Sequence, residues 1–137
     1  MKVLPYAINS NVKILIEPEP DLLIEKSGEF LDFIKEINHP LIGLNCDLGH
    51  FTCVNEDPAE AVLKLQDYIG HVHIEDIKNR VHDHKILGHG DMDYKSIYVA
   101  LKEIKYDGYV TVELYPYQDT PDEAGRESLE FLRKNFV

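Results

Sequence analysis

The sequence predicts an α/β fold in which helices cover a parallel sheet. Short apolar segments alternate with longer amphipathic segments, and the alternation occurs four times within 137 residues. This pattern is typical of consecutive βα units, and the chain has the usual length of one domain. We therefore expect a single domain over residues 1–137.

The first two units are delimited by prolines and by a helix cap. The first strand ends at Pro18 and Pro20, because proline cannot donate a hydrogen bond to a sheet. The helix that follows has apolar residues near helical spacing and stops before Pro40. After the second strand and a loop, Asp57 can cap the next helix, with Pro58 as its first residue. The strands are expected at residues 12–17 and 41–47, and the helices at residues 21–38 and 58–68.

The last two units are separated by the longest connection in the chain. Residues 75–92 are rich in His, Asp and Gly, and loops of this length inside a compact domain are usually functional. Asp93 can cap the helix that follows, and a turn at residues 106–108 precedes the fourth strand. The strands are expected at residues 70–74 and 109–114, and the helices at residues 94–105 and 122–135.

Composition limits the classes of protein to consider. The chain is 44% hydrophobic and 28% charged, as in ordinary globular proteins. It has no apolar run near the roughly 20 residues of a membrane helix and no signal-peptide pattern, so we expect a cytoplasmic protein without membrane contact. The net charge of −11 disfavours nucleic acid as a partner. Cys46 and Cys53 match no redox or zinc-ribbon motif, and we interpret both as reduced structural residues.

Four potential metal ligands each fall at or next to the C-terminal end of a predicted strand, where parallel α/β folds build their active sites. Side chains on a strand alternate between faces, so the four converge if those faces point inward, while Cys46 should face away. Three carboxylates and one imidazole suit Mn²⁺, Mg²⁺ or Co²⁺, with Zn²⁺ also acceptable. The alternative is that each acid is a surface residue or a helix cap. The four residues are Glu17, Asp47, His73 and Glu113.

These residues lie within motifs that resemble the xylose isomerase-like barrel superfamily, which contains sugar and sugar-phosphate isomerases, ketose 3-epimerases and endonuclease IV enzymes. The resemblance covers nearly the whole chain, and each motif alone is weak, but five occur in the expected order. The motifs are Glu17 in ILIEP, Asp47 and His50 in DLGH, His73 and Asp76 in HIED, Gly88 and Gly90 in LGHGDMD, and Glu113 in YVTVEL.

The resemblance implies an eight-stranded (β/α)8 TIM barrel, of which this chain supplies half. Its four βα units correspond to strands five to eight, and an intact barrel needs about 200 residues or more. An open four-stranded sheet would expose two edges and an apolar inner face. A second copy, forming a homodimer, or a separate N-terminal half-barrel would close it. The alternative is that the sequence is a truncated fragment of a longer protein.

The resemblance also implies a chemistry. One divalent ion, held by the four potential ligands, would polarise a carbonyl of a sugar or sugar phosphate and stabilise the enediolate formed by proton abstraction. Glu17 and Glu113 would remove and return the proton, and His50 would position the carbonyl oxygen, although it could instead be a loop histidine that binds Asp47. Arg80 is a candidate ligand for a hydroxyl or phosphate group, or else a solvated charge.

A second metal and two other functions remain open from the sequence. His82 and His84 form a His-x-His pair, which can place two imidazoles on one ion. A comparable segment in endonuclease IV enzymes completes a zinc cluster, so a zinc phosphodiesterase acting at abasic DNA sites is one alternative function. The acidic balance of the chain disfavours it. The other alternative is a half-barrel without catalysis that acts as an assembly subunit.

Overall fold

The computed structural model describes residues 2–136, and its main sheet has four parallel strands, as the sequence predicts. The strand order is β1-β2-β3-β6, and the register pairs Ile14 with Ile42, Asp47 with His73, and Ile74 with Val112. Within residues 2–136, β1 and β6 each pair with one neighbour in this sheet and form its two edges. The strands are β1 (Ile14–Ile16), β2 (Ile42–Asp47), β3 (Ile69–Ile74) and β6 (Val110–Val112).

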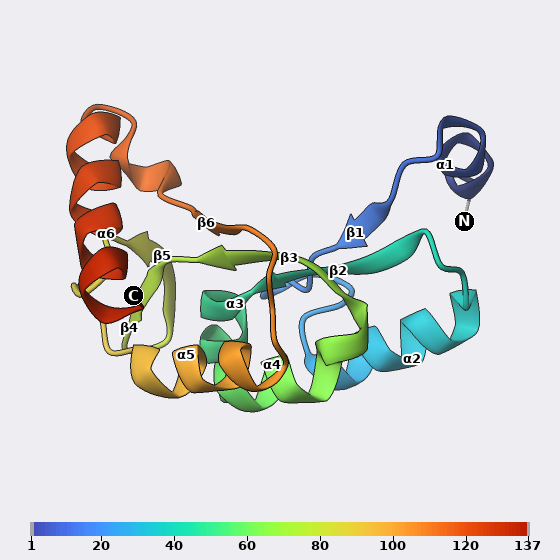
Figure 1. The fold of residues 1–137 in the computed structure, drawn as a ribbon, viewed down its shortest axis with the longest axis horizontal. Coiled ribbons are helices and arrows are strands. Elements are labelled where there is room, and N and C mark those ends of the chain that lie inside the picture. Colours follow the sequence, from blue (N-terminus) through green and yellow to red (C-terminus); the bar gives the residue numbers. More distant parts are fainter. Residues whose placement is uncertain (1, 137) are drawn as a thin grey trace.

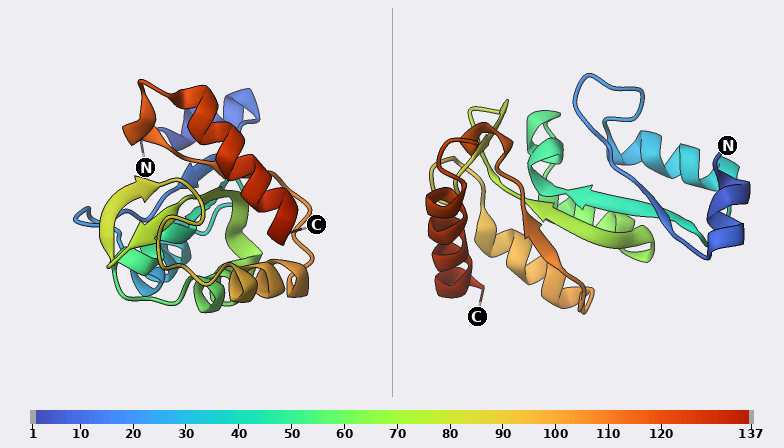
Figure 2. Two further views of the ribbon diagram at one scale, coloured as in Figure 1. Left: turned by 90° about the vertical axis from the view of Figure 1, so that its left-hand side faces the viewer. Right: turned by 90° about the horizontal axis from the view of Figure 1, so that it is seen from above.

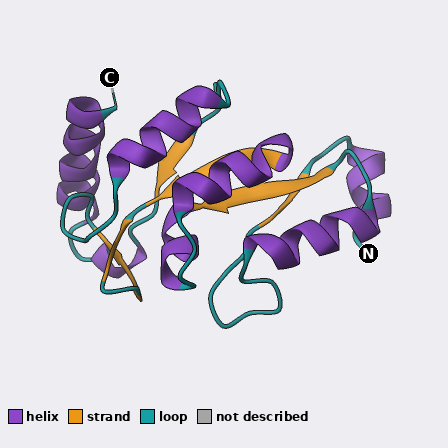
Figure 3. Cartoon of the chain, turned by 90° about the horizontal axis from the view of Figure 1, so that it is seen from below, coloured by secondary structure: helices purple, strands orange, loops and turns teal. Residues whose placement is uncertain are grey.

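Three helices lie along one face of this sheet, as Figures 1 and 3 show. They are α2 (Ser27–Ile37), α4 (Pro58–Leu65) and α5 (Tyr94–Glu103). The helices α1 (Leu4–Ser10) and α6 (Pro121–Asn135) lie at opposite ends of the molecule, which is clearest from above (Figure 2). Two short 3-10 segments, η1 (Gln66–Tyr68) and η2 (Tyr115–Tyr117), follow α4 and β6. No helix that the structure describes is both long and apolar enough to cross a membrane.

The hydrophobic core lies between the sheet and these helices. Leu44 and Cys46 from β2 are fully buried there, as are Val72 and Ile74 from β3. They pack with apolar residues of the helices, such as Phe30 of α2. Because strand side chains alternate, the intervening residues of β2 and β3 point to the opposite face. The expected orientation of Cys46, away from the polar face, is confirmed.

The predicted helix caps are also confirmed. Asp57 accepts hydrogen bonds from the backbone N–H groups of Ala59 and Glu60 at 2.8 and 3.0 Å. Asp93 accepts them from Lys95 and Ser96 at 3.1 and 3.2 Å. Each cap satisfies N–H groups that have no partner within the first turn of a helix.

The helix expected at residues 21–38 begins only at Ser27, which corrects the sequence interpretation. Residues 18–26 form a loop closed by a hydrogen bond from Glu19 N–H to the carbonyl of Ile24, at 2.9 Å. The side chain of Glu29 accepts hydrogen bonds from the N–H groups of Glu25 and Lys26 and so fixes the start of α2. Local side-chain bonding therefore outweighs the apolar periodicity of the preceding residues.

Two segments expected as loops contain regular structure. Directly after β2 comes the short helix α3 (Leu48–Cys53), and Asp47 caps it by accepting the His50 N–H at 2.8 Å. The long connection contains an antiparallel hairpin of β4 (Asp76–Lys78) and β5 (Val81–Lys85). Asn79 and Arg80 have positive φ values of 54° and 59°, as the tight turn of a hairpin requires. Polar residues in β5 hide the alternation that normally identifies a strand. The N-terminal helix α1 was likewise not expected.

Candidate metal centre

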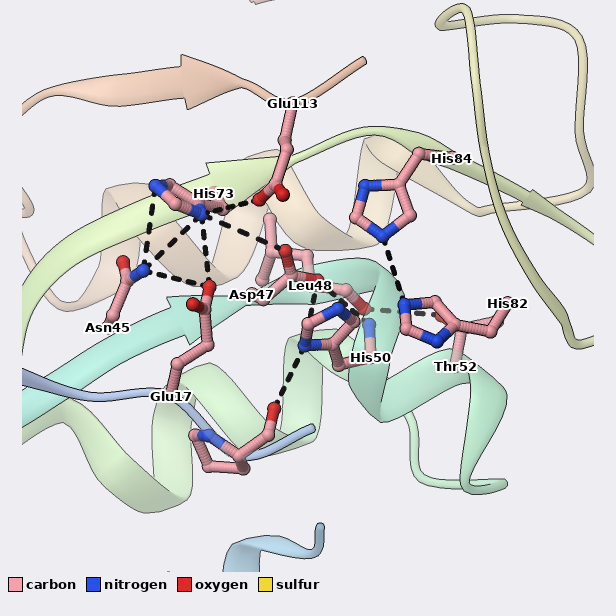
Figure 4. Close-up of polar contacts among 11 residues, drawn as sticks. Glu17, Asn45, Asp47, Leu48, His50, Thr52, His73, His82, His84 and Glu113 are labelled. Carbon is pink, nitrogen blue, oxygen red and sulfur yellow. Dashed lines mark hydrogen bonds and ion pairs between the residues drawn. The ribbon is translucent and has the colours of Figure 1, made fainter. Parts of the chain in front are cut away.

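The four predicted metal ligands come together at the C-terminal end of the sheet. Asp47 is the last residue of β2 and His73 lies one residue before the end of β3, while Glu17 and Glu113 directly follow β1 and β6. Each offers one ligand atom, and these atoms all lie within 4.8 Å of one another. Figure 4 shows the side chains pointing toward a common point.

His73 lies at the centre of this group. Its Nδ1 atom is 2.8 Å from Glu113 Oε2, 3.0 Å from Glu17 Oε1 and 4.0 Å from Asp47 Oδ2. The Asp47 side chain is completely buried, whereas the side chains of Glu17 and Glu113 are 30% and 35% exposed. The group is therefore closed to solvent at Asp47, and a molecule can approach it from solvent beside Glu17 and Glu113.

The electrostatics of this group suit a divalent cation. Three carboxylates surround one imidazole, and Asp47 Oδ2 is a buried oxygen with no hydrogen-bond donor among the described residues. Burial, followed by the charge of Asp47, raises the pKa of Glu17. A cation would relieve both the repulsion and the unsatisfied oxygen. The oxygen-rich donor set fits Mn²⁺, Mg²⁺ or Co²⁺, and Zn²⁺ is also compatible with it.

A second cluster of possible ligands contains three histidines: His50, His82 and His84, with ligand atoms within 4.8 Å of one another. The Nε2 atoms of His82 and His84 are 3.0 Å apart. The Nδ1 atom of His50 donates a hydrogen bond to the carbonyl of Pro18 at 2.9 Å, so Nε2 is the ring nitrogen that could act as a ligand. Burial lowers the pKa of His84 and so favours its neutral, ligating form. The sequence predicts only the two residues of β5 for this cluster, and the structure adds His50.

Arg80 faces a pocket that neither cluster lines. It occupies the turn between β4 and β5 and lines a pocket together with residues such as Thr52, Asp57 and Asp93. None of the four predicted ligands contributes to the walls of that pocket. The structure therefore does not bring Arg80 to the predicted metal centre.

Comparison with known proteins decides the family. A family model described as "Xylose isomerase-like TIM barrel" matches residues 1–135. The chain belongs to this family. An L-ribulose 3-epimerase of Methylomonas sp. is 28% identical over 148 residues, which cover 94% of this chain and 49% of the relative.

Solved structures of this barrel family agree. A D-allulose 3-epimerase from Methylomonas sp. in complex with D-allulose aligns with a TM-score of 0.79 and 27% identity, over 98% of this chain and 52% of that one. A 3-keto-D-glucoside 4-epimerase from E. coli aligns with a TM-score of 0.81 and 26% identity, over 97% and 50%. These three relatives are sugar epimerases, and the chain spans about half their length.

Two of the motifs described in the sequence, HIED and LGHGDMD, hold the loop after β5. Asp76 Oδ2 accepts hydrogen bonds from the N–H groups of Gly88 and Gly90 at 2.9 and 2.8 Å. Its Oδ1 accepts them from Ile77 at 2.9 Å and from Met92 at 3.3 Å. A side chain at position 90 would collide with Asp76 itself. The aspartate of HIED and the glycines of LGHG therefore form one structural unit.

Glu75 is an acidic residue beside the centre that the sequence interpretation missed. It is completely buried, and neither carboxyl oxygen has a hydrogen-bond donor among residues 2–136. Burial, followed by the charge of Asp47, raises the pKa of Glu75 well above its ordinary value. Its contact with Asp47 becomes a hydrogen bond only when one of the two carboxyl groups carries a proton. Its position two residues after His73, directly past the end of β3, is a signal that could have identified it.

Proposed function

We propose that the protein acts as a divalent-metal-dependent isomerase or epimerase of a sugar or sugar phosphate. The observation that supports this most strongly is the gathering of four ligand atoms within 4.8 Å at the carboxyl ends of four parallel strands. The names of the relatives, which are sugar epimerases, agree with this substrate class.

The positions of the two glutamates support a role in proton transfer. Glu17 follows β1 and Glu113 follows β6, so they approach His73 from opposite edges of the sheet (Figure 4). A divalent ion, when bound, supplies Lewis acidity that polarises a substrate carbonyl. One glutamate then accepts the proton from the neighbouring carbon at a carboxylate oxygen, and the other returns a proton to the substrate.

His50 is proposed to position the carbonyl oxygen of the substrate. Its Nδ1 atom is engaged by Pro18, so only Nε2 is free for this contact. The ring is nearly completely buried, which fixes its orientation. Arg80 is proposed as a contact only for an extended substrate, because it lies in a separate pocket.

The site requires a closed barrel. We propose that the four described strands correspond to strands five to eight and that four further βα units complete the ring, from a second copy or from a separate N-terminal half. Mass measurement by light scattering distinguishes these sources. A species of twice the chain mass supports the homodimer, whereas a species of one chain mass that associates with an added N-terminal half supports the second. A monomer that binds neither contradicts both.

The reaction is tested by exchange of a substrate C–H proton with solvent deuterium. The assembled protein, stripped with a chelator and reloaded with Mn²⁺, should catalyse exchange on at least one member of a panel of ketoses, aldoses and their phosphates. The Glu113→Gln variant should abolish exchange, whereas Glu127→Gln, which changes an exposed residue paired with His89, should not. Absence of metal-dependent exchange over the whole panel contradicts the proposal.

A second ion is proposed at His82 and His84, with His50 Nε2 as its third ligand in place of the contact to a substrate carbonyl, because that nitrogen can serve only one of the two roles. Three imidazole nitrogens favour zinc, and the separation of 3.0 Å between two Nε2 atoms is close to what a shared tetrahedral ion requires. Wild type and the His82→Asn, His84→Asn double variant are each equilibrated with Zn²⁺ and analysed for zinc. Wild type should contain one more zinc ion per chain than the double variant. Equal zinc content in the two proteins contradicts this second site.

A further inference from the structure

The side chain of Asn45 contacts two of the four potential metal ligands, Glu17 and His73. Asn45 lies on β2, two residues before Asp47, and therefore on the same face of the sheet. Its Nδ2 donates a hydrogen bond to Glu17 Oε1 at 2.8 Å, across the gap to the end of β1. Figure 4 shows the amide between Glu17 and His73.

The same amide nitrogen also approaches the neighbouring strand. Asn45 Nδ2 is 3.3 Å from Nδ1 and 3.5 Å from Nε2 of His73. Asn45 therefore touches two of the four proposed ligands, one from β1 and one from β3, while its own strand supplies a third, Asp47. Asn45 is not itself one of the four proposed ligands.

Glu17 needs such a partner more than the other ligands do. It lies just beyond a strand of three residues and before a loop with two prolines, and its side chain is 30% exposed. Apart from His73, Asn45 is the only hydrogen-bonding side chain that reaches its carboxylate in residues 2–136. A flexible carboxylate must lose rotamer freedom before it can bind an ion, unless a neighbour already holds it.

We infer that Asn45 is a positioning residue, which holds Glu17 Oε1 by its amide N–H and so pre-orients the Glu17 carboxylate for a divalent cation. This inference rests on the proposed cation site and adds to it a residue outside the ligand set. Partners that orient ligands in this way typically contribute about 10–100-fold to metal affinity.

The contacts of Asn45 indicate that it orients Glu17 and contributes little to the stability of the fold. Its Oδ1 atom is buried without a hydrogen-bond partner in the described chain, so the side chain is not fully satisfied by the fold. A leucine at this position has nearly the same shape and removes that unsatisfied oxygen, while partly exposed Glu17 keeps access to water. Thermal stability without metal should therefore be retained.

The test compares Asn45→Leu with wild type and with Thr111→Val. Thr111 lies on the same face, and among the described residues its side chain bonds only to His71, at 2.8 Å, so it provides a matched control. Calorimetric titration with Mn²⁺ should show binding weakened about 10–100-fold in Asn45→Leu and unchanged in Thr111→Val. The thermal midpoint of Asn45→Leu in chelator should stay within about 2 °C of wild type.

A double-mutant cycle tests whether the effect passes through Glu17. In a Glu17→Ala background, Asn45→Leu should change the Mn²⁺ affinity by less than about twofold. The inference is overturned if Asn45→Leu alone binds Mn²⁺ as tightly as wild type. It is also overturned if Asn45→Leu weakens binding equally in the wild-type and Glu17→Ala backgrounds. In both cases Mn²⁺ binding by the wild-type protein still supports the cation site. A wild-type protein that binds no Mn²⁺ overturns the proposed function and this inference together.

Discussion

Gly49 lies directly against the carboxyl group of Glu75. A Cβ atom at position 49 would overlap Glu75 Oε1 and come within 2.9 Å of Ile77 Cγ1. Because Glu75 is completely buried, its side chain cannot move out into solvent to make room. The first turn of α3 can therefore pass over β3 only with a glycine at this position.

The Gly49→Ala variant should be destabilised by about 1–3 kcal/mol, since the inserted methyl group overpacks a closed site. Urea unfolding measures the change. Gly125→Ala is the matched control, because that helical glycine has no atom within 4 Å of its Cβ position, and it should gain about 0.5–1 kcal/mol. Adding Glu75→Ala to the first variant should restore most of the loss, and a loss that persists would contradict the proposed collision.

Replacement of Glu75 by glutamine should change how stability depends on pH. The folded-state pKa of Glu75 is raised above its ordinary value of 4.5, so the folded state binds more protons than the unfolded state. Wild-type stability should therefore fall as the pH rises from 4.5 through that raised pKa. Glutamine cannot ionise, so the fall should be smaller in Glu75→Gln, and the variant should be the more stable protein at about pH 8.

The experiment is unfolding of chelator-treated protein at several pH values. Some pH dependence should remain in the variant, because the pKa of Glu17 is also raised, first by burial. If the free energy of unfolding changes with pH in the same way in wild type and Glu75→Gln between about pH 4.5 and 8, ionisation of Glu75 does not destabilise the folded protein as expected.

Asp76→Ala should be among the most destabilising single substitutions. It removes the acceptor of four backbone N–H groups and leaves several of them buried or half-buried. The expected loss is about 3 kcal/mol. Hydrogen exchange should show faster exchange at Gly88 and Gly90 in particular. Asp32→Ala, at an exposed helical position, should leave stability unchanged, and slow exchange of both glycines in Asp76→Ala would refute this role.

The two cysteines should differ in reactivity. Burial raises the pKa of Cys53 to about 11, so alkylation at about pH 8 should be roughly 10- to 100-fold slower than for a free thiol. The rate should rise about tenfold per pH unit up to that pKa. Burial also raises the pKa of Cys46, which is completely enclosed in the core and should react only after unfolding. Peptide mapping after timed alkylation separates the two, and equal rates in the folded protein would contradict the prediction.

The four βα units could be predicted because their signals are local. Apolar alternation marks β2 and β3, and the caps at Asp57 and Asp93 mark the starts of α4 and α5. The start of α2 could not be read correctly, because the apolar residues before Ser27 continue the helical spacing while the Glu29 side chain fixes the first turn there. The β4–β5 hairpin was missed because its strand His82-Asp83-His84 carries polar side chains on both faces.

The gathering of Glu17, Asp47, His73 and Glu113 could be predicted from position alone, since the carboxyl ends of parallel strands meet at one edge of a sheet. His50 could not be assigned to the histidine cluster in this way, because that requires knowing that residues 48–53 are helical and turn its ring toward β5. Asn45 and Glu75 were missed for a related reason: their roles come from neighbours on other strands and not from their own motifs.

The junction between β2 and α3 has a mechanical consequence. Asp47 ends the strand and caps the helix through the N–H of His50, so a single turn of backbone joins the oxygen-rich group to the three imidazoles. Because this hydrogen bond ties Asp47 to the first turn of α3, we expect a tilt of the helix that displaces His50 to displace Asp47 as well.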